Sequence, residues 1–170
     1  HPAELSWRAG VDVLCLGGTK NGLPLGEAIV FFRNELAVDF AYRIKQAGQL
    51  ASKMRFIAAP WLGLLEEQVW LKNAQHANAM AKRLHDALSS IPQVETLFPC
   101  EANAVFVRLP ETAAQKLHAA GWRFYEFIGG GCRLMCAWDT APEMVDKLAT
   151  AVRDACSGPV SRPGGVESCA

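Results

Sequence analysis

The sequence lacks a long uninterrupted hydrophobic run and any excess of charge of one sign. Its longest apolar stretch, residues 56–65, contains Pro60 and is too short to span a bilayer. Basic residues (Lys and Arg) and acidic residues (Asp and Glu) number 17 each, so the formal net charge is zero. Without a basic run, the chain has no electrostatic footprint for nucleic acid or for a membrane surface. We therefore expect no nucleic acid and no membrane as partners.

The six cysteines include no C-x-x-C pair, and they are scattered along the chain. Several of them stand inside apolar segments. Buried free thiols in a reducing cytoplasm fit this pattern better than disulfides or a zinc site. No basic start followed by an apolar run marks a signal peptide. We therefore expect a cytoplasmic protein without a metal. The cysteines are Cys15, Cys100, Cys132, Cys136, Cys156 and Cys169.

What the chain does have is one distinctive stretch, residues 11–26, with the sequence VDVLCLGGTKNGLPLG. An apolar strand predicted over residues 11–16 ends at two glycines, and Thr19 and Lys20 follow. A second apolar strand is predicted over residues 27–32. The continuous apolar character of both strands predicts a sheet that is covered on both faces. Lys20 is then presented on a glycine-rich turn between two buried strands.

A lysine at such a turn can be held in apolar surroundings, where its charged form is disfavoured and its pKa falls below about 10.4. A neutral lysine amine is a nucleophile that forms Schiff bases with carbonyl compounds. Pyridoxal 5'-phosphate (PLP) is the most common such partner, and it acts as an electron sink. The alternative is a surface lysine on an Asn-Gly turn, because Gly-Gly-Thr-Lys is a weak pattern by itself.

Three blocks of the sequence carry a family resemblance. SWRAGVDVLCLGGTKNG followed by GEAIVFF resembles the PLP-lysine segment of low-specificity L-threonine aldolases, which are fold type I (aspartate-aminotransferase-like) enzymes of amino-acid metabolism. The likeness continues through YRIKQAGQLASKMRFIAAPWLGLLE and ends with CRLMCAWDT. It implies an α/β fold: the C-terminal portion of a fold type I large domain, followed by a small α+β domain.

With this resemblance, we expect residues 1–60 to end the PLP-binding large domain and residues 61–156 to form a linking helix and the small domain. We expect residues 157–170 to be a flexible tail. The apolar spacing predicts an amphipathic helix from Leu36 to Met54, a break at Pro60 and a long helix over 62–89. The strands and helices expected beyond residue 90 are strands 94–98, 104–109, 124–128 and 132–138, helix 111–120 and a helix from Pro142.

The resemblance assigns roles to residues near the turn. Lys20 is expected to be the Schiff-base lysine and a proton carrier at the substrate α-carbon. Thr19 is expected to hydrogen-bond the cofactor, with a simple turn hydroxyl as the alternative. Lys45 best matches the family's basic residue, for a phosphate contact across a subunit boundary. Lys53 and Arg55 share its predicted helix face. The alternative for all three basic residues is a solvated face without a phosphate contact.

Arg133 is expected to bind the substrate carboxylate. It stands in an apolar strand after three glycines, and a charge rarely enters such surroundings without a partner. A guanidinium matches a carboxylate with two parallel hydrogen bonds, and the family has an arginine in a matching segment. The alternative is an ion pair with Asp139 or Glu126. The three helical histidines are interpreted as polar-face or core residues: His76, His85 and His118.

The resemblance implies PLP-dependent aldol cleavage of L-threonine or L-allo-threonine to glycine and acetaldehyde, in a homodimer or homotetramer. In this family the PLP lysine lies near mid-chain, so we expect these 170 residues to be a C-terminal part that is inactive alone. One alternative is another PLP-dependent lyase or aminotransferase of the same fold. The other is a non-catalytic fragment whose helix over residues 36–54 serves oligomer assembly.

Overall fold

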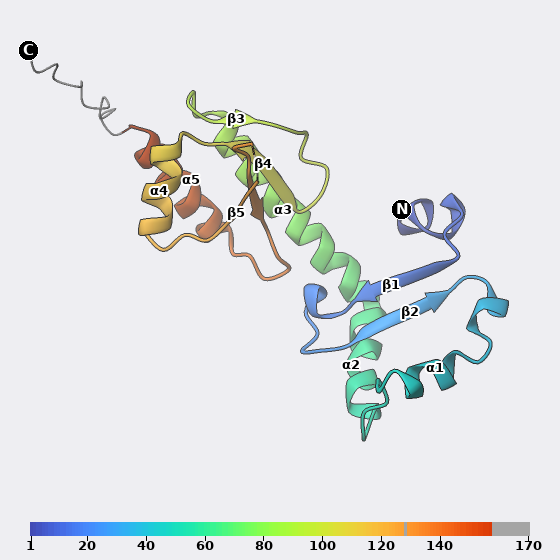
Figure 1. Ribbon diagram of the computed structural model, residues 1–170. Helices are drawn as coiled ribbons and strands as arrows, with labels where there is room; N and C mark the ends of the chain where they lie inside the picture. The colour runs from blue at the N-terminus through green and yellow to red at the C-terminus, as the bar shows by residue number, and fades with distance from the viewer. Residues whose placement is uncertain (128, 158–170) are drawn as a thin grey trace, which may run out of the picture. The chain divides into compact units, whose positions relative to one another are not determined.

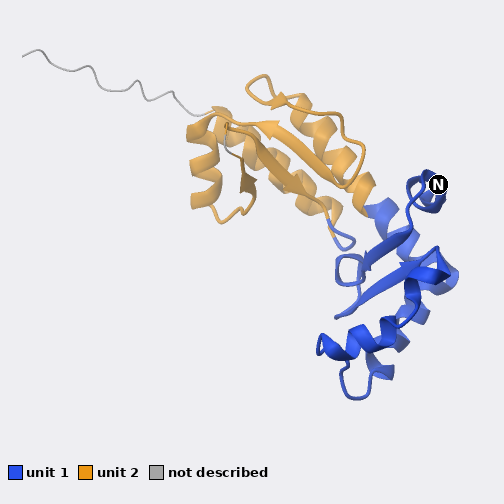
Figure 2. Ribbon diagram, turned by 45° about the vertical axis from the view of Figure 1, so that its right-hand side comes forward, with its two compact units in different colours: residues 1–76, 137–139 blue, residues 77–136, 140–170 orange. Residues whose placement is uncertain are grey.

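The computed structural model describes residues 1–127 and 129–157, which form two compact units (Figure 2). Unit 1 comprises residues 1–76 and 137–139, and unit 2 comprises the remaining described residues. The change from one unit to the other falls within a helix, between His76 and Ala77. The predicted division at residue 60 stays a prediction. The tail expected over residues 157–170 lies, apart from Ser157, outside the described residues.

Unit 1 is built on an antiparallel hairpin of β1 (Val13–Gly17) and β2 (Glu27–Phe31), which lie side by side (Figure 1). Their register pairs Val13 with Phe31 and Gly17 with Glu27. The remaining helical elements of this unit are η1 (Pro2–Leu5), η2 (Trp7–Ala9), η3 (Thr19–Asn21), η4 (Asn34–Ala37), α1 (Phe40–Gln46), α2 (Arg55–Leu65), η5 (Glu66–Gln68) and the first part of α3 (Val69–Ser89).

Both strands of the hairpin were predicted correctly, but the prediction that they are covered on both faces is wrong for the described residues. Ile29 and Val30 point to opposite faces of the sheet, and they remain 43% and 36% exposed. The apolar sequence of a strand does not show whether its two faces are covered. In this hairpin, the described residues do not cover both faces.

The amphipathic helix predicted from Leu36 to Met54 is not one helix. Asp39 has a φ of 60°, so the chain leaves the helical region between η4 and α1. Gly48 (φ 68°) and Lys53 (φ 57°) keep the segment between α1 and α2 irregular. Helical hydrogen bonding requires negative φ at every residue, so the three- and four-residue spacing in this region does not reflect a continuous helix.

The break predicted at Pro60 is also misplaced. Pro60 lies inside α2, because its fixed φ is compatible with helical geometry even though it lacks an amide donor. The interruption comes later, where Glu67 and Gln68 adopt φ values of 52° and 58° before α3 begins. No helix among the described residues is long and apolar enough to cross a membrane.

Unit 2 is a four-stranded antiparallel sheet with helices packed against one of its faces, as the small α+β domain was predicted to be. Its strand order is β3-β4-β6-β5. The buried core joins α3 (Leu84, Leu88) to β4 (Val105, Val107). The β4 residues between and beside these valines, such as Phe106, point to the opposite face of the sheet. The elements are the rest of α3, β3 (Glu95–Thr96), β4 (Ala104–Arg108), α4 (Glu111–Ala119), β5 (Tyr125–Glu126), β6 (Cys132–Met135) and α5 (Pro142–Ser157).

Candidate functional site

The turn that carries Lys20 follows directly from the end of β1. The amide of Gly18 donates a hydrogen bond to the carbonyl of Gly26 at 3.1 Å, and the carbonyl of Gly18 accepts from the amides of Asn21 and Leu23. A Cβ on Gly18 would lie 2.7 Å from Leu23 Cδ1 and 2.8 Å from the Gly26 oxygen. Only glycine fits this closely packed position, and the following residues are therefore directed into the short helix η3.

Thr19 and Lys20 project from this turn as exposed side chains. Neither makes a hydrogen bond or an ion pair with any residue in the described part of the chain. The apolar surroundings that we expected for Lys20 are thus not supplied by the described residues. Its amine is accessible to a carbonyl compound from solvent.

The turn is tied to α3 by residues that the sequence analysis did not single out. Asn73 Nδ2 donates to the backbone carbonyl of Asn21 at 2.8 Å, and Asn21 Nδ2 donates to the carbonyl of Trp70 at 3.0 Å. Gly22 closes the turn with a φ of 106°, and a Cβ there would lie 3.3 Å from Asn73 Nδ2. Asparagines 52 residues apart carry no local signal, so no sequence pattern could have identified this pair.

The three basic residues predicted to share one helix face do not do so. Lys45 lies in the last turn of α1, Lys53 lies between α1 and α2, and Arg55 begins α2. The guanidinium of Arg55 stands 4.9 Å from the ring centroid of Phe56. Lys45 is exposed and makes no ion pair with the described residues, so it is free to contact an anion.

Arg133 lies on β6, directly opposite Phe106 on one side and Tyr125 on the other. Its neighbours Cys132 and Leu134 point into the core, whereas Arg133 points to the opposite face and is exposed. The guanidinium stands 5.4 Å from the Tyr125 ring centroid, within cation–π range. Arg133 makes no ion pair with the described residues of unit 2.

Of the two alternative partners weighed for Arg133, Glu126 is already engaged. Its carboxylate lies 2.6 Å from His118 Nε2, and the His118 ring stacks on Phe124. Asp139 belongs to unit 1, whereas Arg133 belongs to unit 2. The arginine therefore presents a guanidinium whose carboxylate partner the described part of unit 2 does not provide. His118 is held by Glu126 and Phe124, consistent with its interpretation as a polar-face or core residue.

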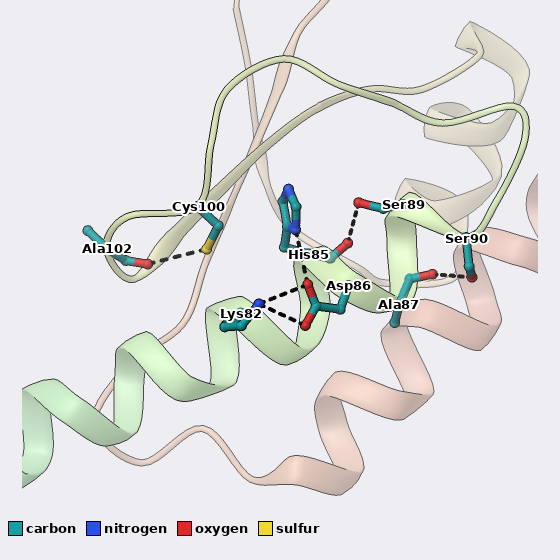
Figure 3. Close-up of polar contacts among 8 residues, drawn as sticks. All are labelled: Lys82, His85, Asp86, Ala87, Ser89, Ser90, Cys100 and Ala102. Carbon is teal, nitrogen blue, oxygen red and sulfur yellow. Dashed lines mark hydrogen bonds and ion pairs between the residues drawn. The ribbon is translucent and has the colours of Figure 1, made fainter.

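A second group of titratable side chains lies in unit 2 around the C-terminal half of α3 (Figure 3). Asp86 accepts hydrogen bonds from Lys82 at 3.1 and 3.3 Å, and the bond from Lys82 lowers the pKa of Asp86. His85 Nδ1 lies 3.4 Å from the same carboxylate. Burial raises the pKa of the Cys100 thiol, which disfavours the nucleophilic thiolate. The group is therefore not a nucleophilic centre.

The residues of unit 1 supply part of what PLP requires. The exposed Lys20 amine can bond to the cofactor aldehyde, the Thr19 hydroxyl can donate or accept a hydrogen bond, and the Lys45 ammonium can pair with a phosphate. Their donor chemistry fits the group. Arg133 fits the carboxylate of an amino acid in the same way, through the fork of its guanidinium.

Comparisons with known proteins extend this description. A sequence model of the family described as beta-eliminating lyase matches residues 2–112. The chain is 60% identical over 153 residues to the low specificity L-threonine aldolase of Pseudomonas aeruginosa. It is 59% identical to the protein of the same name from Pseudomonas sp. strain NCIMB 10558. Each alignment covers 89% of this chain and 44% of the relative, so the chain spans less than half the length of the curated relatives it matches.

Solved structures are similar over most of the chain. Threonine aldolase from Leishmania major superposes with a TM-score of 0.78 at 24% identity, over 86% of this chain and 44% of that one. An inhibitor-bound glycine decarboxylase (P-protein) of the glycine cleavage system gives a TM-score of 0.51 at 17% identity, over 84% and 34%. The first likeness confirms the predicted fold class, a partial fold type I α/β chain.

Proposed function

The chain belongs to the beta-eliminating lyase family, and we propose that the protein containing it is a PLP-dependent L-threonine aldolase. The reaction would cleave L-threonine or L-allo-threonine to glycine and acetaldehyde. The observation that carries the proposal is the position of Lys20: an exposed amine on a glycine turn, within the segment that matches the family. The identity to two proteins named as threonine aldolases supports the choice of substrate.

PLP, on which the family depends, supplies an electron sink when bound. We propose that Lys20 holds the cofactor covalently and yields its place to the substrate amine. Its amine, once released, would carry a proton to or from the substrate α-carbon. We propose that Thr19 hydrogen-bonds the cofactor and that Lys45 pairs with its phosphate, as their exposed polar groups allow.

We propose that Arg133 binds the substrate carboxylate through two parallel hydrogen bonds. A carboxylate held at two points cannot rotate freely, so the bond to be broken at the α-carbon keeps one orientation. The exposed guanidinium over Tyr125 supports this role, because the described part of unit 2 offers it no carboxylate. Lys53 and Arg55 receive no role in the proposal.

We also propose a cytoplasmic homodimer or homotetramer. Unit 1 leaves large apolar side chains exposed, and such surface is typical of a contact between subunits. Light scattering of the purified protein tests this, since a monomer at micromolar concentration would contradict it. The alternative of a non-catalytic fragment that serves assembly was tied to one helix over residues 36–54, and this segment instead forms η4, α1 and irregular chain. The exposed residues include Val38, Tyr42, Leu50, Phe56 and Leu62.

The experiment that tests the function is product analysis with the full-length protein, PLP and L-threonine. Aldol cleavage yields glycine and acetaldehyde in equal amounts. The family description favours one second candidate, β-elimination, which would convert L-threonine to 2-oxobutanoate and ammonia. Equimolar glycine and acetaldehyde support the proposal, and 2-oxobutanoate as the main product would replace it with the second candidate. The Lys20→Ala variant is the control, in which either product should disappear.

A further inference from the structure

We propose that Asn73 is a positioning residue that holds the Lys20 turn in the geometry needed to capture the cofactor. This inference rests on the proposed function of Lys20, and it assigns a role in that chemistry to a residue of α3. All the groups involved belong to unit 1, which is blue in Figure 2.

Two hydrogen bonds carry the inference, and they link the same two segments from both sides. Asn73 Nδ2 reaches the backbone carbonyl of Asn21, the residue that follows Lys20, at 2.8 Å. Asn21 Nδ2 returns to the carbonyl of Trp70 at 3.0 Å. Trp70 and Asn73 are three residues apart, so they lie on the same face of α3. The turn is thereby fixed to the helix through both its backbone and its side chain.

The remaining hydrogen bonds of the turn are local. The Asn21 and Leu23 amides both donate to the carbonyl of Gly18, which shapes the turn but does not anchor it to another element. The side chains of Thr19 and Lys20 are unbonded within the described chain. Among the described residues, Trp61 of α2 packs against the turn at Gly18, and the two bonds with α3 are the side-chain hydrogen bonds that fix the backbone next to Lys20 to a helix.

Gly22, the residue after Asn21, packs closely against Asn73. Its φ is 106°, a backbone conformation that residues with a side chain rarely adopt. A Cβ there would meet Asn73 Nδ2 at 3.3 Å and the Trp138 ring at 3.5 Å. The Asn73 amide therefore sits close against the backbone of the turn. A residue at position 73 that cannot donate would leave the Asn21 carbonyl without this partner.

Capture of PLP requires the Lys20 amine to meet an aldehyde at a defined angle, and a loosened turn spends less time in that geometry. A single neutral hydrogen bond changes such an equilibrium by roughly 2- to 10-fold. We therefore expect loss of the Asn73 donor to slow cofactor capture by this factor. The KM for threonine should change little, because Arg133 rather than the turn is proposed to bind its carboxylate.

The test uses the full-length enzyme with three variants. Asn73→Asp keeps the shape of the side chain, removes the amide donor and adds a negative charge, so a displaced titration counts for the positioning role only where the uncharged variant Asn21→Ala shows it too. Asn21→Ala removes the return bond without altering α3, and so covers the case in which Asn73→Asp fails to fold. Asn78→Asp is the matched control, since Asn78 is exposed on the same helix and its side chain makes no hydrogen bond with the described residues.

The first readout is the rate at which each apoenzyme and PLP form the visible chromophore. The second is the pH at which that chromophore titrates, a property that general destabilisation would not shift. We expect both Asn73→Asp and Asn21→Ala to capture PLP about 2- to 10-fold more slowly with a displaced titration, while Asn78→Asp matches wild type.

Two outcomes are distinguishable. Wild-type capture and titration in both Asn73→Asp and Asn21→Ala overturn the positioning role and leave the proposed function intact. A chromophore that still forms in Lys20→Ala would instead overturn the proposed function itself.

Discussion

Replacing Arg133 by alanine in the full-length enzyme should weaken binding of the amino-acid substrate and leave the cofactor in place. Arg133 is the exposed guanidinium on the open face of the unit 2 sheet, 5.4 Å from the Tyr125 ring. Alanine removes the charge and the N–H donors of the guanidinium without disturbing the core, because the neighbours Cys132 and Leu134 face the other way.

A hydrogen bond to a charged group contributes about 1.5–3 kcal/mol, which corresponds to a rise in KM of about 10- to 150-fold. Solvent weakens exposed charge pairs, and Arg133 is exposed in the structure. We therefore expect the lower end, a rise of about tenfold in the KM for L-threonine. Arg133→Lys retains the charge but not the planar fork, so its KM should lie between those of the wild type and Arg133→Ala.

The assay measures initial rates of acetaldehyde formation against threonine concentration, with bound PLP quantified by absorbance. Arg108→Ala is the matched control, because Arg108 lies on β4 of the same sheet and already pairs with Glu95. Its KM should stay at the wild-type value. Loss of PLP from Arg133→Ala with an unchanged KM would refute the carboxylate role and make Arg133 a structural or cofactor residue.

Three further predictions concern other parts of the chain. Lys45→Ala should raise the apparent Kd for PLP in a spectral titration with little change in the KM for threonine, and an unchanged Kd would exclude a phosphate contact. Leu88→Ala, at a fully buried position, should lower the free energy of unfolding by about 2–5 kcal/mol in urea denaturation, and a loss below 1 kcal/mol would contradict its place in the core. Asp146→Asn should lower the urea midpoint at pH 7 but not in acid. The hydrogen bond from Arg83 lowers the pKa of Asp146, so the stabilisation exists above the usual carboxyl pKa and is lost as pH falls through the lowered value. A difference that persists in acid would contradict this account.

Much of the secondary structure was predictable because local signals were strong. The β2 strand was predicted over residues 27–32 and is observed over Glu27–Phe31, and the helix expected from Pro142 begins there. The unpredicted features are backbone conformations that composition does not mark. Asp39 and Lys53 adopt positive φ although neither is a glycine, and together with Gly48 they interrupt what the apolar spacing indicated as one helix.

Residues of the candidate site could be proposed from the sequence only where a single residue type would carry the chemistry. Lys20 is identified by glycines on one side and an Asn-Gly turn on the other, and Arg133 by a charge within an apolar strand. Asn73 could not be proposed from the sequence, because its proposed role depends on a contact with Asn21 across 52 residues. The exposure of Lys20 was also unexpected, since a run of apolar residues does not reveal which of its faces is covered.

The central claim is that Lys20 binds the cofactor covalently, and borohydride reduction of the PLP-loaded full-length enzyme tests it most directly. Reduction fixes the bond between PLP and the lysine, so peptide mapping by mass spectrometry can locate the modified residue. We predict phosphopyridoxyl on the peptide that contains Lys20, and no stable adduct and no visible chromophore in Lys20→Ala. A phosphopyridoxyl group on another lysine, with wild-type absorbance in Lys20→Ala, would contradict the claim.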